Sequence, residues 1–269
     1  MTTSPSTAAE KTVDRARRRA EQDDRARSTS PSATNAAVAR VEAMRRRTGV
    51  RRFVFENGLS LAALTLFALS FVGQIAAGFR DENAEQQDHG QPPMTIAAYL
   101  TSGAFVEATA ENWESEFLQM GLFVLLTGFL YQRGSSESKR IEEPEAVDED
   151  PSDAKQDAET PWPVRQGGLW LGIYKYSLSG SLLLLFLISF GAHVMGGVRQ
   201  YNEQQLDHGG RSITTLGYLA TSRLWFESFQ NWQSEFFSVA VLVLLSLRLR
   251  QQGSPQSKPV AAPAGDTGE

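Results

Sequence analysis

Residues 59–79 read LSLAALTLFALSFVGQIAAGF and contain no charged side chain. A helix needs about 20 apolar residues to cross the roughly 30 Å of hydrocarbon in a bilayer. Residues 177–198 read SLSGSLLLLFLISFGAHVMGGV, a second stretch of this length in which a histidine is the one titratable residue. Both stretches therefore predict transmembrane helices.

Two shorter apolar runs, residues 117–131 and 236–249, follow these stretches. Trp113 and Trp232 stand just before them, and tryptophan is enriched where a helix enters a membrane. An even number of crossings also agrees with the charge pattern along the chain. We therefore expect four spans, at about residues 57–79, 112–132, 176–198 and 231–250.

The two halves of the chain match without a gap at an offset of 119 residues. The tripeptide Asp-His-Gly at 88–90 recurs at 207–209, and Asn-Trp at 112–113 recurs at 231–232. Because each half crosses twice, both copies have the same orientation. The predicted fold is all-α, with four transmembrane helices arranged as two tandem parallel-repeat hairpins.

This organisation divides the chain into five segments. They are a basic, mostly disordered cytoplasmic tail (1–50), the first two-helix repeat (51–140), an acidic disordered linker (141–165), the second two-helix repeat (166–258) and a C-terminal tail (259–269). Lysine and arginine gather at both chain ends and around the linker, which predicts that these parts are cytoplasmic and that both hairpin loops face outward.

The charge of the N-terminal segment indicates its partner. Residues 1–52 carry 13 Lys and Arg against 6 acidic residues, whereas the whole chain has a net charge of -5. A basic segment directly before a span is typical of contact with anionic lipid. No nucleic-acid-binding motif accompanies it, so we expect the lipid bilayer rather than nucleic acid as its partner.

Several short motifs point to relatives of this chain. They are ENGLSL, AEQQDHG, ENWESEFLQM, RGSSESK, PWPVRQGG, YNEQQLDHGG, FQNWQSEF and QGSPQSK. With these motifs, over about residues 51–258, the chain resembles an uncharacterised bacterial membrane-protein family of the domain-of-unknown-function kind. The resemblance implies a multi-pass protein of the bacterial plasma membrane, and it implies no activity.

The repeated Asp-His-Gly allows two interpretations. Asp88, His89, Asp207 and His208 combine carboxylate and imidazole groups, which suit zinc, manganese or iron. Adjacent residues of a helix point about 100° apart, however, so Asp88 and His89 do not share a face. In the alternative, the histidines close helix ends at left-handed glycines, Gly90 and Gly209, and no metal is needed.

The segments after these glycines contain candidate capping residues. A hydroxyl side chain at the N-cap accepts a hydrogen bond from the first turn of a helix. We expect Thr95 and Thr214 each to cap a short turn, which carries Tyr99-Leu100 in the first copy and Tyr218-Leu219 in the second. We expect Ser102 and Ser222 to cap the second and fourth long helices.

Four further polar residues lie within or beside the apolar stretches. Gln74 and His193 occupy equivalent positions, and such groups either form hydrogen bonds between helices or take part in function. Glu116 and Glu235 are expected one turn after the tryptophans, at the outer interface, where a buried acid would serve a proton relay.

The sequence identifies no catalytic residue and no cofactor. The chain has no cysteine, which excludes disulfides, thiolate metal sites and a cysteine nucleophile. No serine hydrolase arrangement and no phosphate-binding loop is present. The interpretation that we favour is a non-enzymatic structural or interaction module of the cell envelope, which a protein partner or self-association would complete. The alternatives are a small channel or transporter along the bundle axis, and a membrane-bound metal-dependent enzyme or sensor.

Overall fold

The computed structural model describes residues 38–39, 41–43, 45, 48–141, 144–153, 159–263, 265 and 267. All regular structure among these residues is helical, which confirms the all-α class. The predicted disorder of the 1–50 tail falls almost wholly outside the described residues, as do residues 142–143 and 154–158 of the linker.

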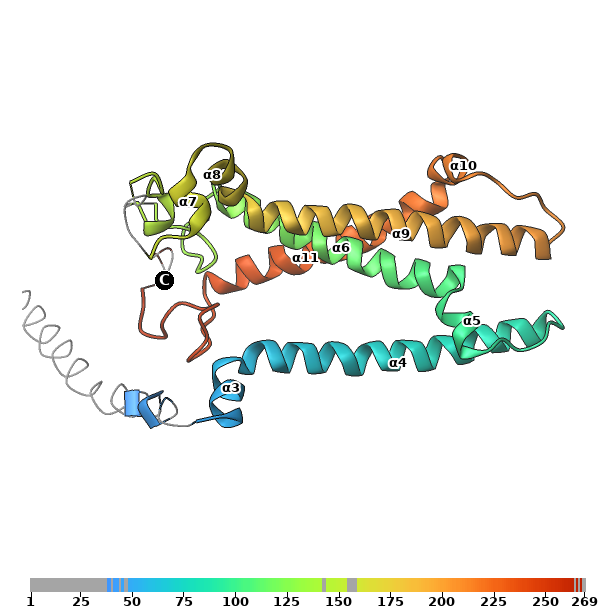
Figure 1. Cartoon of the computed structure of the whole chain (residues 1–269), viewed down its shortest axis with the longest axis horizontal. Helices are drawn as coiled ribbons and strands as arrows, with labels where there is room; N and C mark the ends of the chain where they lie inside the picture. Colours follow the sequence, from blue (N-terminus) through green and yellow to red (C-terminus); the bar gives the residue numbers. More distant parts are fainter. Residues whose placement is uncertain are drawn as a thin grey trace, which may run out of the picture. The chain divides into compact units, whose positions relative to one another are not determined.

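The helices differ widely in length. They are α3 (Val50–Glu56), α4 (Gly58–Asp88), α5 (Ile96–Leu100), α6 (Gly103–Thr127), the 3-10 helix η1 (Ala146–Asp148), α7 (Trp162–Gln166), α8 (Gly168–Lys175), α9 (Ser177–Asp207), α10 (Thr215–Leu219) and α11 (Ser222–Ser246) (Figure 1). Every bound of α9, α10 and α11 lies 119 residues after the corresponding bound of α4, α5 and α6. Both halves of the chain therefore contain the same succession of a long, a short and a long helix.

The chain divides into two compact units, residues 1–74 and residues 75–269. The first contains α3 and the beginning of α4. Within it, Arg52 donates a hydrogen bond to Glu56 at 2.7 Å, one helical turn further on. The second unit contains the rest of the chain, including every residue of the candidate site.

Two of the described helices, α4 and α9, are long and apolar enough to cross a membrane. Each has 31 residues, about 46 Å of helix. Of the four predicted spans, only the first and third therefore correspond to helices of this kind among the described residues. α6 and α11 have 25 residues each, and charged side chains interrupt their N-terminal halves. These residues are Glu107, Glu111, Glu114 and Glu116 in α6, and Arg223 and Glu227 in α11.

Glycine ends both long helices, as predicted. α4 ends at Asp88 and α9 at Asp207, and the nearby Gly90 and Gly209 have φ angles of 69° and 73°. This left-handed conformation is open to glycine because it has no Cβ. This conformation allows the backbone N–H of the next residue to donate a hydrogen bond to the last turn of the helix. In the first copy, Gln91 donates to the Gln86 carbonyl at 2.8 Å.

Side-chain caps begin the helices that follow. Thr95, Thr214 and Ser102 each accept a hydrogen bond from the backbone N–H three residues further on, which confirms three predicted N-caps. The prediction for Ser222 was wrong. Thr221 caps α11 and Ser222 is its first helical residue, because the equally suitable hydroxyl one position earlier takes this role.

The core of the second unit is the antiparallel pair α6 and α9, with α11 packed against α6 and α10 against α9 (Figure 1). The backbones lie close together at Gly103 and Gly196. A Cβ on Gly196 would lie 2.5 Å from the backbone nitrogen of Glu107, and one on Gly103 would lie 2.6 Å from that of Gln200. These two glycines therefore allow the contact that brings the first turns of α6 against α9.

The buried residues of α9 are mostly small or polar, whereas many of its exposed residues are large and apolar. Its buried residues are Ser179, Ser189, His193, Val194, Gly196, Gly197 and Gln200. Its large exposed apolar residues include Leu178, Leu184, Leu185, Leu187, Ile188 and Met195. This distribution is the reverse of the one found in water-soluble helices, in which the apolar stripe faces the core.

Candidate functional site

The candidate site is a buried group of charged side chains where α6, α9 and α11 meet, with α10 beside them. His193 of α9 is at its centre and is completely buried. Its Nδ1 lies 3.0 Å from Oε2 of Glu114 on α6, whose side chain is also completely buried. The crossing at Gly103 and Gly196 brings these two helices close enough for this contact.

The bond between His193 and Glu114 orients the imidazole ring. A carboxylate accepts hydrogen bonds and does not donate them, so Nδ1 of His193 carries the proton. Trp232 of α11 donates its indole N–H to the other carboxylate oxygen of Glu114, at 3.2 Å. Both oxygens of Glu114 are thereby satisfied, and three helices are joined through one carboxylate.

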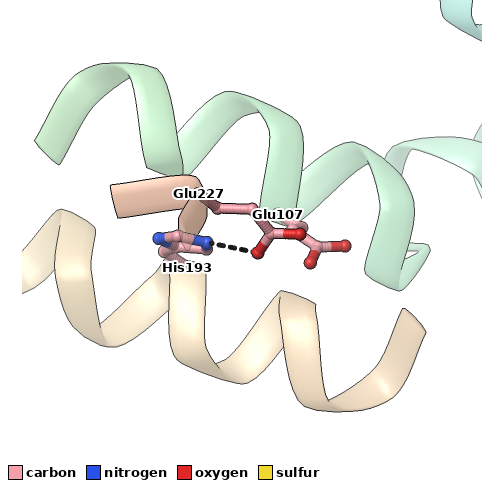
Figure 2. Close-up of side chains that lie close together, drawn as sticks. All are labelled: Glu107, His193 and Glu227. Atoms are coloured by element: carbon pink, nitrogen blue, oxygen red, sulfur yellow. Dashed lines mark ion pairs between the residues drawn. The ribbon is translucent and has the colours of Figure 1, made fainter. Parts of the chain in front are cut away.

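The opposite ring nitrogen of His193 faces acidic side chains. Nε2 lies 3.5 Å from Oε2 of Glu227 and 3.9 Å from Oε2 of Glu111. It is buried and makes no hydrogen bond of acceptable geometry. Figure 2 shows His193 pointing towards Glu227 with Glu107 beside them, and one ligand atom from each of these three residues lies within 4.8 Å of the others.

Arg223 and Tyr218 hold two of the acids in place. Nε of Arg223 donates to Oε1 of Glu227 at 2.9 Å, and its Nη2 lies 3.4 Å from Oε1 of Glu107. The Tyr218 hydroxyl lies 3.2 Å from that same Glu107 oxygen and 3.3 Å from Oε2 of Glu227. Nη1 of Arg223 donates to Gln204 at 2.6 Å, which anchors the guanidinium to α9.

Burial alters the protonation of the groups of the site that lie outside the expected spans, namely Glu107, Glu111 and Tyr218. It raises the pKa of Glu107, although the neighbouring Arg223 guanidinium acts in the opposite direction. Burial raises the pKa of Glu111 to about 7, and the nearby carboxylates of Glu107, Glu114 and Glu227 act in the same direction. It also raises the pKa of the Tyr218 hydroxyl far above its usual range, so this group remains a hydrogen-bond donor.

The metal ligands suggested by the repeated Asp-His-Gly lie elsewhere. The rings of His89 and His208 are 6.1 Å apart, but all four residues, Asp88 and Asp207 included, are exposed. Nδ1 of His89 lies 2.9 Å from the carbonyl oxygen of residue 85 of its own helix, and Nδ1 of His208 lies 2.7 Å from that of residue 204. Each histidine thus contacts the end of its own helix. In the described part of the chain, the residues that bring three ligand atoms together are those around His193.

The remaining sequence candidates are scattered. Gln74 is half-buried on α4, Glu116 is exposed on α6 and Glu235 is half-buried on α11. Of the polar residues predicted within or beside the apolar stretches, His193 is the one that the structure places in the site.

The carboxylates around His193 were not among the sequence candidates. Glu107, Glu111 and Glu114 are spaced by four and three residues, so they follow one face of α6. At the offset of 119 the second half has Phe226, Gln230 and Gln233 in their place. This spacing and the break in the repeat are the signals from which these three acids could have been identified.

The arrangement can hold a cation or move a proton between buried carboxylates and an imidazole. No curated protein and no solved structure matches the chain. One family model, described as Domain of unknown function (DUF6766), matches residues 50–269, which include every residue of the site. The chain therefore belongs to the DUF6766 family.

Proposed function

We propose that this protein is a multi-pass integral membrane protein of the bacterial envelope that acts as a structural or interaction module. Two copies of one helical hairpin cross the membrane four times in total, with both termini and the linker in the cytoplasm. In this arrangement α6 and α11 cross with their apolar C-terminal halves. Their charged N-terminal halves stand at the outer surface with the ends of α4 and α9.

The observation that carries this proposal is the reversed polarity of α9. Six of its seven buried residues are serine, glycine, histidine or glutamine, while many leucine and isoleucine side chains are exposed. In water such a surface would associate without specificity. In a bilayer it is favourable, because small and polar residues support helix contacts and apolar side chains face lipid.

In this arrangement the basic segment before the first long helix would also contact lipid. Arg45, Arg51 and Arg52 precede the first long helix and would lie at the cytoplasmic surface, next to anionic headgroups. A second copy of the chain or another envelope protein would contact the outward-facing aromatic side chains of α11, among them Phe226 and Phe229, which are 68% and 58% exposed.

Reporter fusions test the topology. A periplasmic and a cytoplasmic reporter are fused in turn after Gly90, after Glu149 and after Gly209. Four spans require external signals at Gly90 and Gly209 and a cytoplasmic signal at Glu149. If only α4 and α9 cross, Glu149 becomes external and Gly209 cytoplasmic.

Fractionation provides the accompanying measurement. The full chain should sediment with membranes and resist extraction by alkaline carbonate, as integral proteins do. Recovery in the soluble fraction, or the two-span reporter pattern, would contradict the proposal.

A further inference from the structure

We propose that Glu107, His193 and Glu227 form a binding site for one divalent transition-metal ion, of the class of Zn²⁺ or Mn²⁺. The three residues come from α6, α9 and α11, so the site exists only in the assembled bundle (Figure 2). The inference does not depend on the number of membrane spans.

His193 is oriented as a metal ligand would be. Metal-bound histidines usually donate one ring N–H to a carboxylate or carbonyl and bind the metal through the other nitrogen. Here Nδ1 bonds to Glu114 at 3.0 Å, and Glu114 is in turn held by the Trp232 indole. The remaining nitrogen, Nε2, is buried without a hydrogen bond and is directed at carboxylates. A buried polar atom in this state calls for a partner.

The distances between the three side chains are close to those of a shared ion. Two ligand atoms that each lie about 2.1 Å from one ion are separated by at most about 4.2 Å. Nε2 of His193 is 3.5 Å from Oε2 of Glu227, within this limit. An oxygen of Glu107 lies within 4.8 Å of the ligand atoms of His193 and Glu227. A side-chain shift of a fraction of an ångström would therefore bring all three ligand atoms within reach of one ion. Glu111, 3.9 Å from Nε2, lies close enough to add a fourth ligand.

Acidic side chains outnumber basic ones in the site. Glu107, Glu111, Glu114 and Glu227 surround His193, and Arg223 is the guanidinium that faces them. Four carboxyl groups thus face one guanidinium and one imidazole. Burying several carboxyl groups together is costly unless they are paired. A divalent cation would pair with the carboxyl groups that Arg223 does not reach.

Two acids of the site are partly exposed to solvent. The side chains of Glu227 and Glu111 retain 20% and 23% of their exposure, while His193 has none. A dissolved ion can therefore contact these two acids, which are the acids nearest to Nε2 on its exposed side. One nitrogen and several carboxylate oxygens form a ligand set that suits borderline divalent ions better than Cu⁺ or Ca²⁺.

Direct titration tests the site. The full chain is purified in detergent, stripped of metal with a chelator and titrated with Zn²⁺ and, separately, with Mn²⁺ by calorimetry. We expect saturable binding of one ion per chain. His193→Gln and Glu107→Gln should each weaken it at least tenfold, and Glu114→Gln, which removes the carboxylate that orients the ring, should weaken it about 10–100-fold. The double variant His89→Gln/His208→Gln is the matched control and should bind as the wild type does.

A second measurement remains valid if a variant does not fold. The melting temperature of the wild type should rise with the Zn²⁺ concentration, because an ion that binds only the folded state stabilises it. The proposal is overturned if wild-type melting does not respond and no saturable binding occurs. It is also overturned if folded His193→Gln retains full affinity, or if affinity is lost in the His89/His208 variant instead.

Discussion

The two halves of this protein have the same helical plan but different interiors. The helices of the second half, α9, α10 and α11, begin and end 119 residues after α4, α5 and α6. In each half an asparagine also stabilises the loop that follows the first long helix. Asn83 accepts a hydrogen bond from the N–H of Met94 at 2.7 Å, and Asn202 accepts one from Ile213 at 2.8 Å. Equivalent residues therefore form the same helices and the same loop hydrogen bonds in both halves.

The charged interior, in contrast, occurs once. Glutamine stands at position 74 where the second half has His193, and Phe226 stands where the first half has Glu107. α6 of the first half supplies three acids, and α9 and α11 of the second supply the histidine and the fourth acid. The comparison teaches that a duplicated plan can contain a site that is not duplicated, because the site is formed between copies.

The largest expected effect comes from removing the centre of this site. His193→Gln introduces the residue that the first half carries at the equivalent position. It should destabilise the fold by about 3 kcal/mol, because it leaves buried acids without their partner. Thermal melts in detergent measure the loss. His208→Gln is the control: its ring is exposed and should alter melting little, and an equal loss in both variants would refute a special role for the buried histidine.

A smaller effect is expected from adding a methyl group at the close contact between α6 and α9. Gly196→Ala places a Cβ about 2.5 Å from the backbone of Glu107, and overpacking of this kind costs about 1–3 kcal/mol. Gly191→Ala in the same helix meets nothing within 4 Å and should cost nothing. Melts of the two variants compare them directly, and equal stability would show that the helices do not need their close contact.

The equivalent tyrosines provide the third comparison. Tyr218→Phe removes a donor shared by Glu107 and Glu227, which should cost about 1.5 kcal/mol. The ring of Tyr99 packs against Phe79 and Phe105, so Tyr99→Phe should cost less. Chemical denaturation of both variants measures the difference, and the reverse order would contradict the asymmetry between the halves.

The smallest effect is expected at an ion pair between the end of the first repeat and the linker. Lys139 of the repeat donates a hydrogen bond to Asp148 of the linker at 2.5 Å, and this bond lowers the pKa of Asp148. A carboxyl with a lowered pKa contributes stability above its unfolded pKa and loses it on acidification. Asp148→Asn should leave neutral-pH melts within experimental scatter, because solvent screens exposed pairs. A clear loss at neutral pH that persists in high salt would show that this pair matters more than its exposure implies.

Local features of the fold were predictable from the sequence. Gly90 and Gly209 end their helices with positive φ, and Thr95, Thr214 and Ser102 are caps, because each depends on residues within one turn. The two longest apolar stretches likewise predicted α4 and α9. The prediction for Ser222 failed at a choice between neighbouring hydroxyls, which a single sequence does not resolve.

The site was predictable only in part. His193 was identified as an inward-facing polar group, but its partners depend on which helices pack together. Sequence symmetry drew attention to residues that occur twice, such as His89 and His208, whereas the buried acids interrupt that symmetry. The contact of Gly103 with Gly196, which brings Glu107 close to His193, involves residues 93 positions apart and follows from packing alone.

The spacing of His193 and Gly196 restricts how this chain can change in length. Gly196 determines where α9 touches α6, and His193 must then lie about one turn away to meet Glu114. One residue inserted between them would rotate the imidazole by about 100° around the helix axis and direct it out of the bundle. The loops at 89–95 and 208–214 lie beyond this contact. Natural insertions and deletions in relatives should therefore collect in those loops and be absent between positions 193 and 196.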